Sequence, residues 1–243
     1  MNPTLKLLAG HRSVRKFEPV PLAAETVRAC VAAAQQAASS SNVQPYSLLQ
    51  VHDAKTRAAL AECTGGQPQV AEAGAFFAVC AEQRRHRLLG EDQGRPYVPN
   101  LETFLVGAID AALFAQNLVI AFESEGLGTC YIGGLRNELE RVRDLLELPP
   151  DVFPLFGLCV GVPAEDPGLK PRLRLDAVLH HDRCPDEATV RADVAELDGR
   201  MAEYYARRGL AGRDWSGGVS RKLARANRST LGEFYRSQGA ELD

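Results

Sequence analysis

The sequence lacks the features of several protein classes. Its 243 residues carry 28 Lys and Arg against 31 Asp and Glu, so no overall positive charge predicts nucleic-acid binding. The six cysteines form no Cys-x-x-Cys pair and no Cys/His spacing typical of zinc, so we expect no metal site and reduced thiols in a cytoplasmic protein. The first residues hold no basic segment followed by an apolar run, so we expect no secretory signal.

Common catalytic signatures are also missing. The chain contains no P-loop, no Gly-x-Ser-x-Gly elbow and no His-Glu-x-x-His, so hydrolase and kinase functions have no support. Gly126 and Gly128 begin like a dinucleotide-binding fingerprint, but Tyr131 occupies the third glycine position. The segment also leads from a helix into a strand, the reverse of the required order, so we expect no Rossmann fold.

The chain does contain one long apolar run, from Phe104 to Phe122. Asp110, Gln116 and Asn117 interrupt it, and such side chains are costly at the centre of a bilayer. The run is apolar nearly all round, which is typical of a central helix. We therefore predict a buried core helix over 101–124 and no membrane span.

Hydrophobic patterning predicts an α+β fold in a single domain, 1–243. Pro21 suits the first turn of a helix over 21–37, and Asn137 with Glu140 has the spacing of a helix cap. Residues 83–100 are interpreted as a surface excursion. The predicted strands are 47–52, 75–81, 129–132 and 155–160, and the other predicted helices are 54–63, 138–148 and 186–208.

Four short segments carry groups suited to an anionic, flat ligand. The segment His11–Arg15 presents two guanidiniums, a hydroxyl and an imidazole, and Lys170 and Arg172 flank a proline. Small hydroxyls fill Ser39–Ser41, and the paired glycines of the turn Tyr131–Gly134 let a flat ring approach the backbone. Each segment by itself is more typical of a surface loop. Together they suit a ligand with a phosphate, a polyol and a flat ring.

These segments resemble the nitroreductase superfamily, and most closely its oxygen-insensitive NADPH nitroreductase and NADPH–flavin oxidoreductase group. The resemblance is colinear and spans almost the whole chain. Its strings are GHRSVR (10–15), SSS (39–41), TGGQ (64–67), AQN (115–117), GTCYIGGLRN (128–137), PLFGLC (154–159), KPR (170–172) and AEYYARRG (202–209).

The resemblance implies a mostly antiparallel central sheet flanked by helices, in an intertwined homodimer. It also implies non-covalent FMN at the subunit interface. The phosphate and ribityl end would be held by His11, Arg12, Ser13, Val14, Arg15, Lys170 and Arg172. The ring would be bordered by Gln67, which binds its polar edge, and by Tyr131, Ile132, Gly133 and Gly134. The other subunit would contribute Ser39, Ser40 and Ser41.

One position departs from the subgroup. Two residues after Gln67 the subgroup often has a histidine, whereas this chain has Gln69. A proton-donating role at this position is therefore in doubt.

The C-terminal extension, 186–243, is expected to carry the NADPH contacts. From Arg200 onward nine Lys and Arg face five Asp and Glu, so this end is locally cationic. By the resemblance, Arg208 would bind the 2′-phosphate of NADPH, with Arg213 as helper, and Arg207 is the adjacent competitor. The basic residues of 221–228 are expected on an exposed helix face.

The implied function is an FMN-dependent oxidoreductase. NADPH would pass hydride to flavin N5, and small acceptors such as nitroaromatics, quinones or flavins would then be reduced in a ping-pong cycle. One alternative is a flavin reductase that supplies reduced FMN to a partner enzyme. Another is a flavin-binding protein without enzymatic activity.

Overall fold

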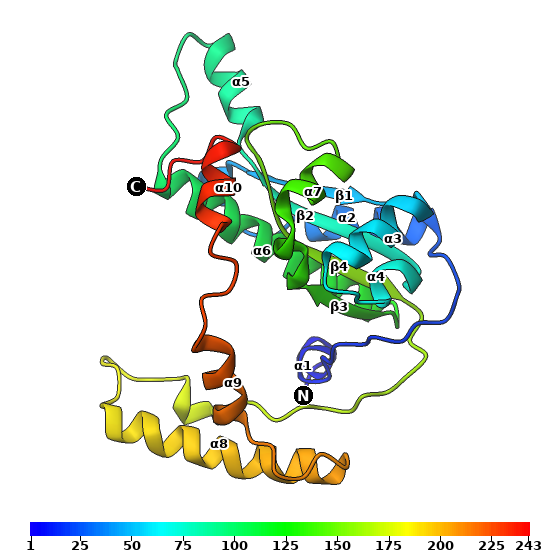
Figure 1. Ribbon diagram of the computed structural model, residues 1–243, viewed down its shortest axis with the longest axis vertical. Coiled ribbons are helices and arrows are strands. Elements are labelled where there is room, and N and C mark those ends of the chain that lie inside the picture. Colours follow the sequence, from blue (N-terminus) through cyan, green and yellow to red (C-terminus); the bar gives the residue numbers. More distant parts are fainter. The chain divides into compact units, whose positions relative to one another are not determined.

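The computed structural model describes residues 1–243, which form two compact units (Figure 1). The first unit combines Met1–Pro167 with Arg228–Asp243, and the second is Gly168–Asn227. The second unit begins earlier than residue 186, where the sequence suggested a C-terminal extension. The two units are described in turn.

The first unit is built on one antiparallel sheet with the strand order β1-β2-β4-β3. The two central strands are buried along nearly their whole length, which explains why their sequences are continuous apolar runs. This confirms the predicted α+β fold. The strands are β1 (Tyr46–Gln50), β2 (Ala75–Glu82), β3 (Gly128–Ile132) and β4 (Val152–Gly161).

The long helix α6 (Leu101–Ser124) packs on one face of this sheet, together with α2 (Ala24–Ala34). Its Phe114 ring stacks on Tyr46 at 4.6 Å between centroids, and its Phe122 ring lies 5.8 Å from that of Phe77. By length and composition α6 is the one helix that could cross a membrane. Here it serves as the core helix of the unit.

The prediction of a buried core helix over 101–124 is only partly right. Large apolar side chains four residues apart remain exposed along one face. Leu105, Ile109 and Leu113 are 44%, 55% and 44% exposed. These, with Leu101, form what we call the α6 apolar row. These side chains form a contiguous exposed apolar stripe on a helix whose other faces are packed.

The opposite face of the sheet is covered by α3 (Ala54–Cys63), α4 (Gln69–Glu72) and α7 (Leu139–Leu145). Phe76 and Ile132 point into this second part of the core. Gly157 in the middle of β4 makes room for the Phe76 ring, because a Cβ at this position would come within 2.6 Å of ring carbons.

Two predictions about local structure were wrong. Helix α2 begins at Ala24, so Pro21 precedes it. Asn137 does not cap α7; its Oδ1 accepts a hydrogen bond from Arg228 Nε at 2.9 Å instead. The excursion 83–100 lies mostly at the surface, as predicted, and contains the helix α5 (Arg84–Asp92). The unit also includes α1 (Pro3–Ala9), α10 (Leu231–Ser237) and the short 3-10 helices η1 (Ser40–Asn42) and η2 (Gly133–Asn137).

The second unit consists of a 3-10 turn, η3 (Leu175–Ala177), and two helices, α8 (Glu187–Arg207) and α9 (Trp215–Leu223). Asp198 of α8 ties the two helices together, since its Oδ1 accepts the backbone N–H groups of Trp215 at 3.0 Å and Ser216 at 2.7 Å. Hydrogen bonds from Ser216 lower the pKa of Asp198. The basic residues of the 221–228 run are mostly exposed, as expected, but Arg225 and Arg228 follow the end of α9 and so do not share a helix face with Arg221 and Lys222.

Candidate functional site

The segment between α1 and the first strand is fixed against β3. Ser13 forms a parallel bridge to Thr129, and the Val14 N–H donates to the Thr129 carbonyl at 2.9 Å. Val14 is buried and lies against Gly128, where an added Cβ would approach within 2.8 Å of the Val14 Cβ. Val14 therefore anchors the segment through packing, while its neighbours are at the surface.

The two arginines of this segment are exposed and have acidic neighbours. Arg12 Nε lies 2.8 Å from Asp166 Oδ1. Glu165 accepts the backbone N–H of Arg15 at 2.9 Å and that of Lys16 at 3.2 Å. The backbone at Arg15 is thus held by a carboxylate, while its exposed guanidinium donates through Nη1 to the Ser13 carbonyl at 3.5 Å.

The segment also carries the imidazole of His11. Its Nδ1 lies 2.7 Å from Glu123 Oε1, near the end of α6. Glu123 and Arg12 both line a cavity of about 600 Å³ beside the segment. The lining of this cavity combines the cations Lys6 and Arg12 with the carboxylates Glu123, Glu165 and Asp166.

The predicted ring contacts Gln67 and Gly134 lie against each other. An added Cβ at Gly134 would come within 2.5 Å of Gln67 Nε2 and 2.6 Å of the Thr64 carbonyl oxygen, so only glycine permits this approach. Gln67 Nε2 donates to Thr64 O at 2.9 Å, and Gln69 Nε2 donates to Gln67 Oε1 at 3.0 Å. Gln69 is buried, so it orients Gln67 and presents no proton to a ligand.

A second cavity, of about 380 Å³, lies where η2 meets α6. Tyr131 is partly exposed there, with its ring edge-on to Phe156 at 5.3 Å, whereas Ile132 is fully buried. Burial of the Tyr131 hydroxyl raises its pKa, so the phenol stays neutral. The cavity is lined by Ala112, Gln116, Tyr131, Gly133, Arg136 and Phe156.

Two arginines near this cavity were missed from the sequence. Arg136 lines it and donates through Nη1 to the Leu155 carbonyl. Burial lowers the pKa of Arg228, and the positive charge of Arg136 lowers it further by a smaller amount. Arg228 was counted among the solvated basic residues of its run. Arg136 could have been noticed because it lies two residues after the Gly133–Gly134 pair.

The serine loop is held by a buried carboxylate on α6. Asp110 is 2% exposed and accepts the Ser39 hydroxyl at 2.7 Å and the Ser40 N–H at 3.1 Å. Ser39 Oγ in turn accepts the Gln44 N–H at 2.7 Å. The loop also contains left-handed backbone, with φ of 48° at Ser41 and 52° at Gln44, which is costly for residues other than glycine.

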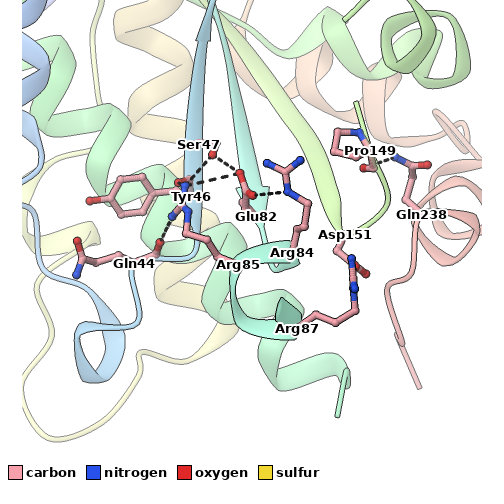
Figure 2. A network of polar contacts seen from close by, with 10 residues as sticks. All are labelled: Gln44, Tyr46, Ser47, Glu82, Arg84, Arg85, Arg87, Pro149, Asp151 and Gln238. Carbon is pink, nitrogen blue, oxygen red and sulfur yellow. Dashed lines mark hydrogen bonds and ion pairs between the residues drawn. The ribbon is translucent and has the colours of Figure 1, made fainter. Parts of the chain in front are cut away.

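Helix α5 holds the other end of this loop (Figure 2). Arg85 donates through Nη1 to the Gln44 carbonyl at 3.1 Å and through Nη2 to the Tyr46 carbonyl at 3.2 Å. The nearly buried Glu82 accepts from Ser47 and, at 3.1 Å, from Arg84 Nε. Ser40 and Ser41 are exposed. The loop that carries them is fixed at both ends by these hydrogen bonds.

The remaining predicted residues belong to the second unit. Lys170 Nζ lies 5.9 Å from the centroid of the Tyr205 ring, and the Arg208 guanidinium lies 5.4 Å from that of Tyr204. The Arg172 carbonyl accepts from Arg200 Nη2 at 2.7 Å. Arg213 is exposed. Their roles toward FMN and NADPH stay predictions.

Comparison with known proteins places the chain in a family. Residues 8–162 match the nitroreductase family, and residues 170–243 match the nitroreductase family C-terminal domain. The chain belongs to the nitroreductase family. It is 42% identical to an oxygen-insensitive NADPH nitroreductase of Salmonella typhimurium and 40% identical to an FMN reductase (NADPH) of Bacillus subtilis, over 98% of both chains in each case. The solved structure of NfrA1 from B. megaterium matches with a TM-score of 0.96 and 40% identity, covering 98% of this chain and 99% of that one.

The residues of this nitroreductase-family chain fit an FMN molecule chemically. A cationic segment suits the phosphate, and the serine hydroxyls suit polar groups. The amide of Gln67 can pair with the donor–acceptor edge of a heterocycle. Gly134 supports this fit, because it lets the η2 backbone close onto the Gln67 loop without a side chain between them.

Replacing Asp110 with alanine should loosen the serine loop. The Ser39 hydroxyl and the Ser40 N–H would lose their acceptor, at a cost of about 1–3 kcal/mol in the free energy of unfolding. Urea unfolding measures that cost, and hydrogen exchange at the Ser40 amide should accelerate. The control is Ser124→Ala, which removes an exposed hydroxyl from the same helix and should change stability by less than about 0.5 kcal/mol. Unchanged exchange at Ser40 in Asp110→Ala would contradict this role.

Proposed function

We propose that this nitroreductase-family chain is an NADPH-dependent FMN oxidoreductase. The observation that carries the proposal is the close contact of Gly134 with Gln67, next to a cavity that Gly133 and Tyr131 border. This arrangement suits a flat heterocycle with a polar edge. The names of the relatives, an NADPH nitroreductase and an FMN reductase (NADPH), support the same cofactor and donor.

The first unit supplies most of the proposed flavin contacts. His11, Arg12, Ser13 and Arg15 bind the phosphate and ribityl end, and Lys170 and Arg172 add positive charge. Gln67, oriented by Gln69, binds the polar edge of the ring. When bound, FMN supplies the hydride-accepting and hydride-donating chemistry. The protein orients the ring, and its cationic groups stabilise negative charge on the reduced cofactor.

The cavity of about 380 Å³ is the proposed place for the acceptor. Its walls combine aromatic rings with the guanidinium of Arg136, which suits flat acceptors with polar oxygens, such as nitroaromatics, quinones or flavins. A flavin reductase that passes reduced FMN to a partner enzyme would use the same residues. Turnover on free FMN compared with turnover on a nitroaromatic distinguishes the two.

The absorbance spectrum of the purified protein tests the cofactor and the donor together. We expect a yellow protein whose flavin bands bleach on anaerobic addition of NADPH, and bleach less readily with NADH. A colourless protein in which added FMN restores no NADPH oxidation would sink the proposal. Bleaching by NADPH without turnover on any acceptor would favour a flavin-binding protein without enzymatic activity.

Arg208 is the proposed ligand of the NADPH 2′-phosphate. Its loss should raise the KM for NADPH about tenfold or more, since a charge-assisted contact to phosphate is removed, while the FMN content stays the same. Steady-state kinetics and the flavin-to-protein absorbance ratio measure the two effects. Arg207→Ala is the matched control, with an adjacent exposed arginine, and should leave the KM near its original value. Lost FMN with an unchanged KM would reject the assignment.

We propose that two copies of the chain form a homodimer through the α6 apolar row. An exposed stripe on the core helix is self-complementary across a two-fold axis, and it supports the dimer that the family resemblance implies. In that dimer the Ser39–Ser41 loop of one subunit would complete the flavin site of the other.

A cytoplasmic location, which cell fractionation would test, fits the five buried free thiols.

A charge in the α6 apolar row should dissociate this dimer. Ile109→Asp would place a carboxylate in the centre of an apolar contact, so sedimentation equilibrium should show a monomer of about half the original mass, with reduced FMN content. Leu223→Asp changes an apolar side chain that is 74% exposed on α9 and should leave the mass unchanged. A monomeric unmodified protein, or a dimeric Ile109→Asp, would exclude this interface.

A further inference from the structure

The carboxylate of Glu123 occupies an unusual place at the end of α6. Its side chain is only 12% exposed, on a helix whose neighbouring buried residues Val119 and Phe122 are apolar. Its Oε1 contacts His11 Nδ1 at 2.7 Å and accepts the Thr129 hydroxyl at 3.0 Å. A largely buried carboxylate needs hydrogen-bond partners, and His11 Nδ1 and the Thr129 hydroxyl are the two that Glu123 has here.

This contact determines which nitrogen of His11 remains for a ligand. Nδ1 faces the carboxylate, so Nε2 is the nitrogen that can reach outward. A phosphate oxygen accepts hydrogen bonds and donates none when ionised. A ring placed between the Glu123 carboxylate and a phosphate must therefore donate from both nitrogens, as an imidazolium does.

The same carboxylate also fixes the backbone beside His11. Thr129, which donates its hydroxyl to Glu123, is 1% exposed, and its carbonyl accepts the Val14 N–H. Glu123 thus holds the side chain of His11 directly and the backbone of Ser13–Val14 through Thr129. Both sets of contacts, to the His11 side chain and to the Ser13–Val14 backbone, therefore lead to Glu123.

Other carboxylates near the segment do different work. Glu165 binds backbone N–H groups, and Asp166 pairs with the guanidinium of Arg12. Glu125, two residues beyond Glu123, is exposed at the end of the same helix. Of these four carboxylates, Glu123 is the one that contacts the imidazole.

We propose that Glu123 is a positioning residue that aims His11 Nε2 at the phosphate of FMN and thereby makes the site select FMN over riboflavin. The inference rests on the proposed function, because it needs a flavin site at this segment. Riboflavin has the same ring and ribityl chain without the phosphate. The orientation of His11 should therefore matter for FMN and not for riboflavin.

The test is a comparison of the two flavins on flavin-stripped full-length protein. Glu123→Gln keeps the shape of the side chain and removes its charge, and flavin fluorescence reports binding. We expect the Kd for FMN to rise about tenfold, the scale of one charge-assisted hydrogen bond, while the Kd for riboflavin changes less than about twofold. Glu125→Gln makes the same charge change on the exposed end of α6 and should alter neither constant.

A double variant separates positioning from general damage. If Glu123 acts through His11, adding Glu123→Gln to His11→Ala should weaken FMN binding no further. The inference would be overturned if Glu123→Gln weakened FMN and riboflavin binding equally. It would also be overturned if Glu123→Gln left the Kd for FMN unchanged. Either result in a protein that binds FMN leaves the proposed function standing. An unmodified protein that binds neither flavin overturns both.

Discussion

The packing of α6 against the sheet is the constraint on which the candidate site depends. This helix carries two carboxylates that are buried or nearly so, and each holds a different segment of the proposed site: Asp110 holds the serine loop, and Glu123 holds the His11 segment. Thirteen residues separate them, or about 20 Å of helix. Because an α-helix has a constant rise per residue, packing α6 against β1 and β2 also fixes the distance between the serine loop and the His11 segment.

Acidic residues organise a site whose proposed ligand is itself an anion. Asp110, Glu123 and Glu165 each accept hydrogen bonds from the segments that would bind FMN. These carboxylates order the donors, and the cations remain at the surface.

Much of the fold could be predicted from the sequence, because β2 and β4 are continuous apolar runs and α6 is long and apolar. The pairs that build the site could not be predicted in this way. Ser39 and Asp110 are 71 residues apart, and His11 and Glu123 are 112 apart, so no local spacing records either contact. Asn137 shows the opposite error: its spacing suits a cap, but Arg228 engages its side chain from a distant segment. The resemblance located the segments, and the structure showed what holds them.

The serine loop illustrates what such anchoring costs and provides. Residues 39–44 are closed by the bond from the Gln44 N–H to Ser39 Oγ and include left-handed backbone at Ser41. The loop is ordered by folding, so a ligand that meets it does not bear the entropic cost of ordering it. The hydrogen bond between Ser39 and Gln44 also fixes the number of residues in the loop. An inserted residue would break the Ser39–Gln44 bond or pull Gln44 away from Arg85, so this stretch can vary in side chains far more readily than in number of residues.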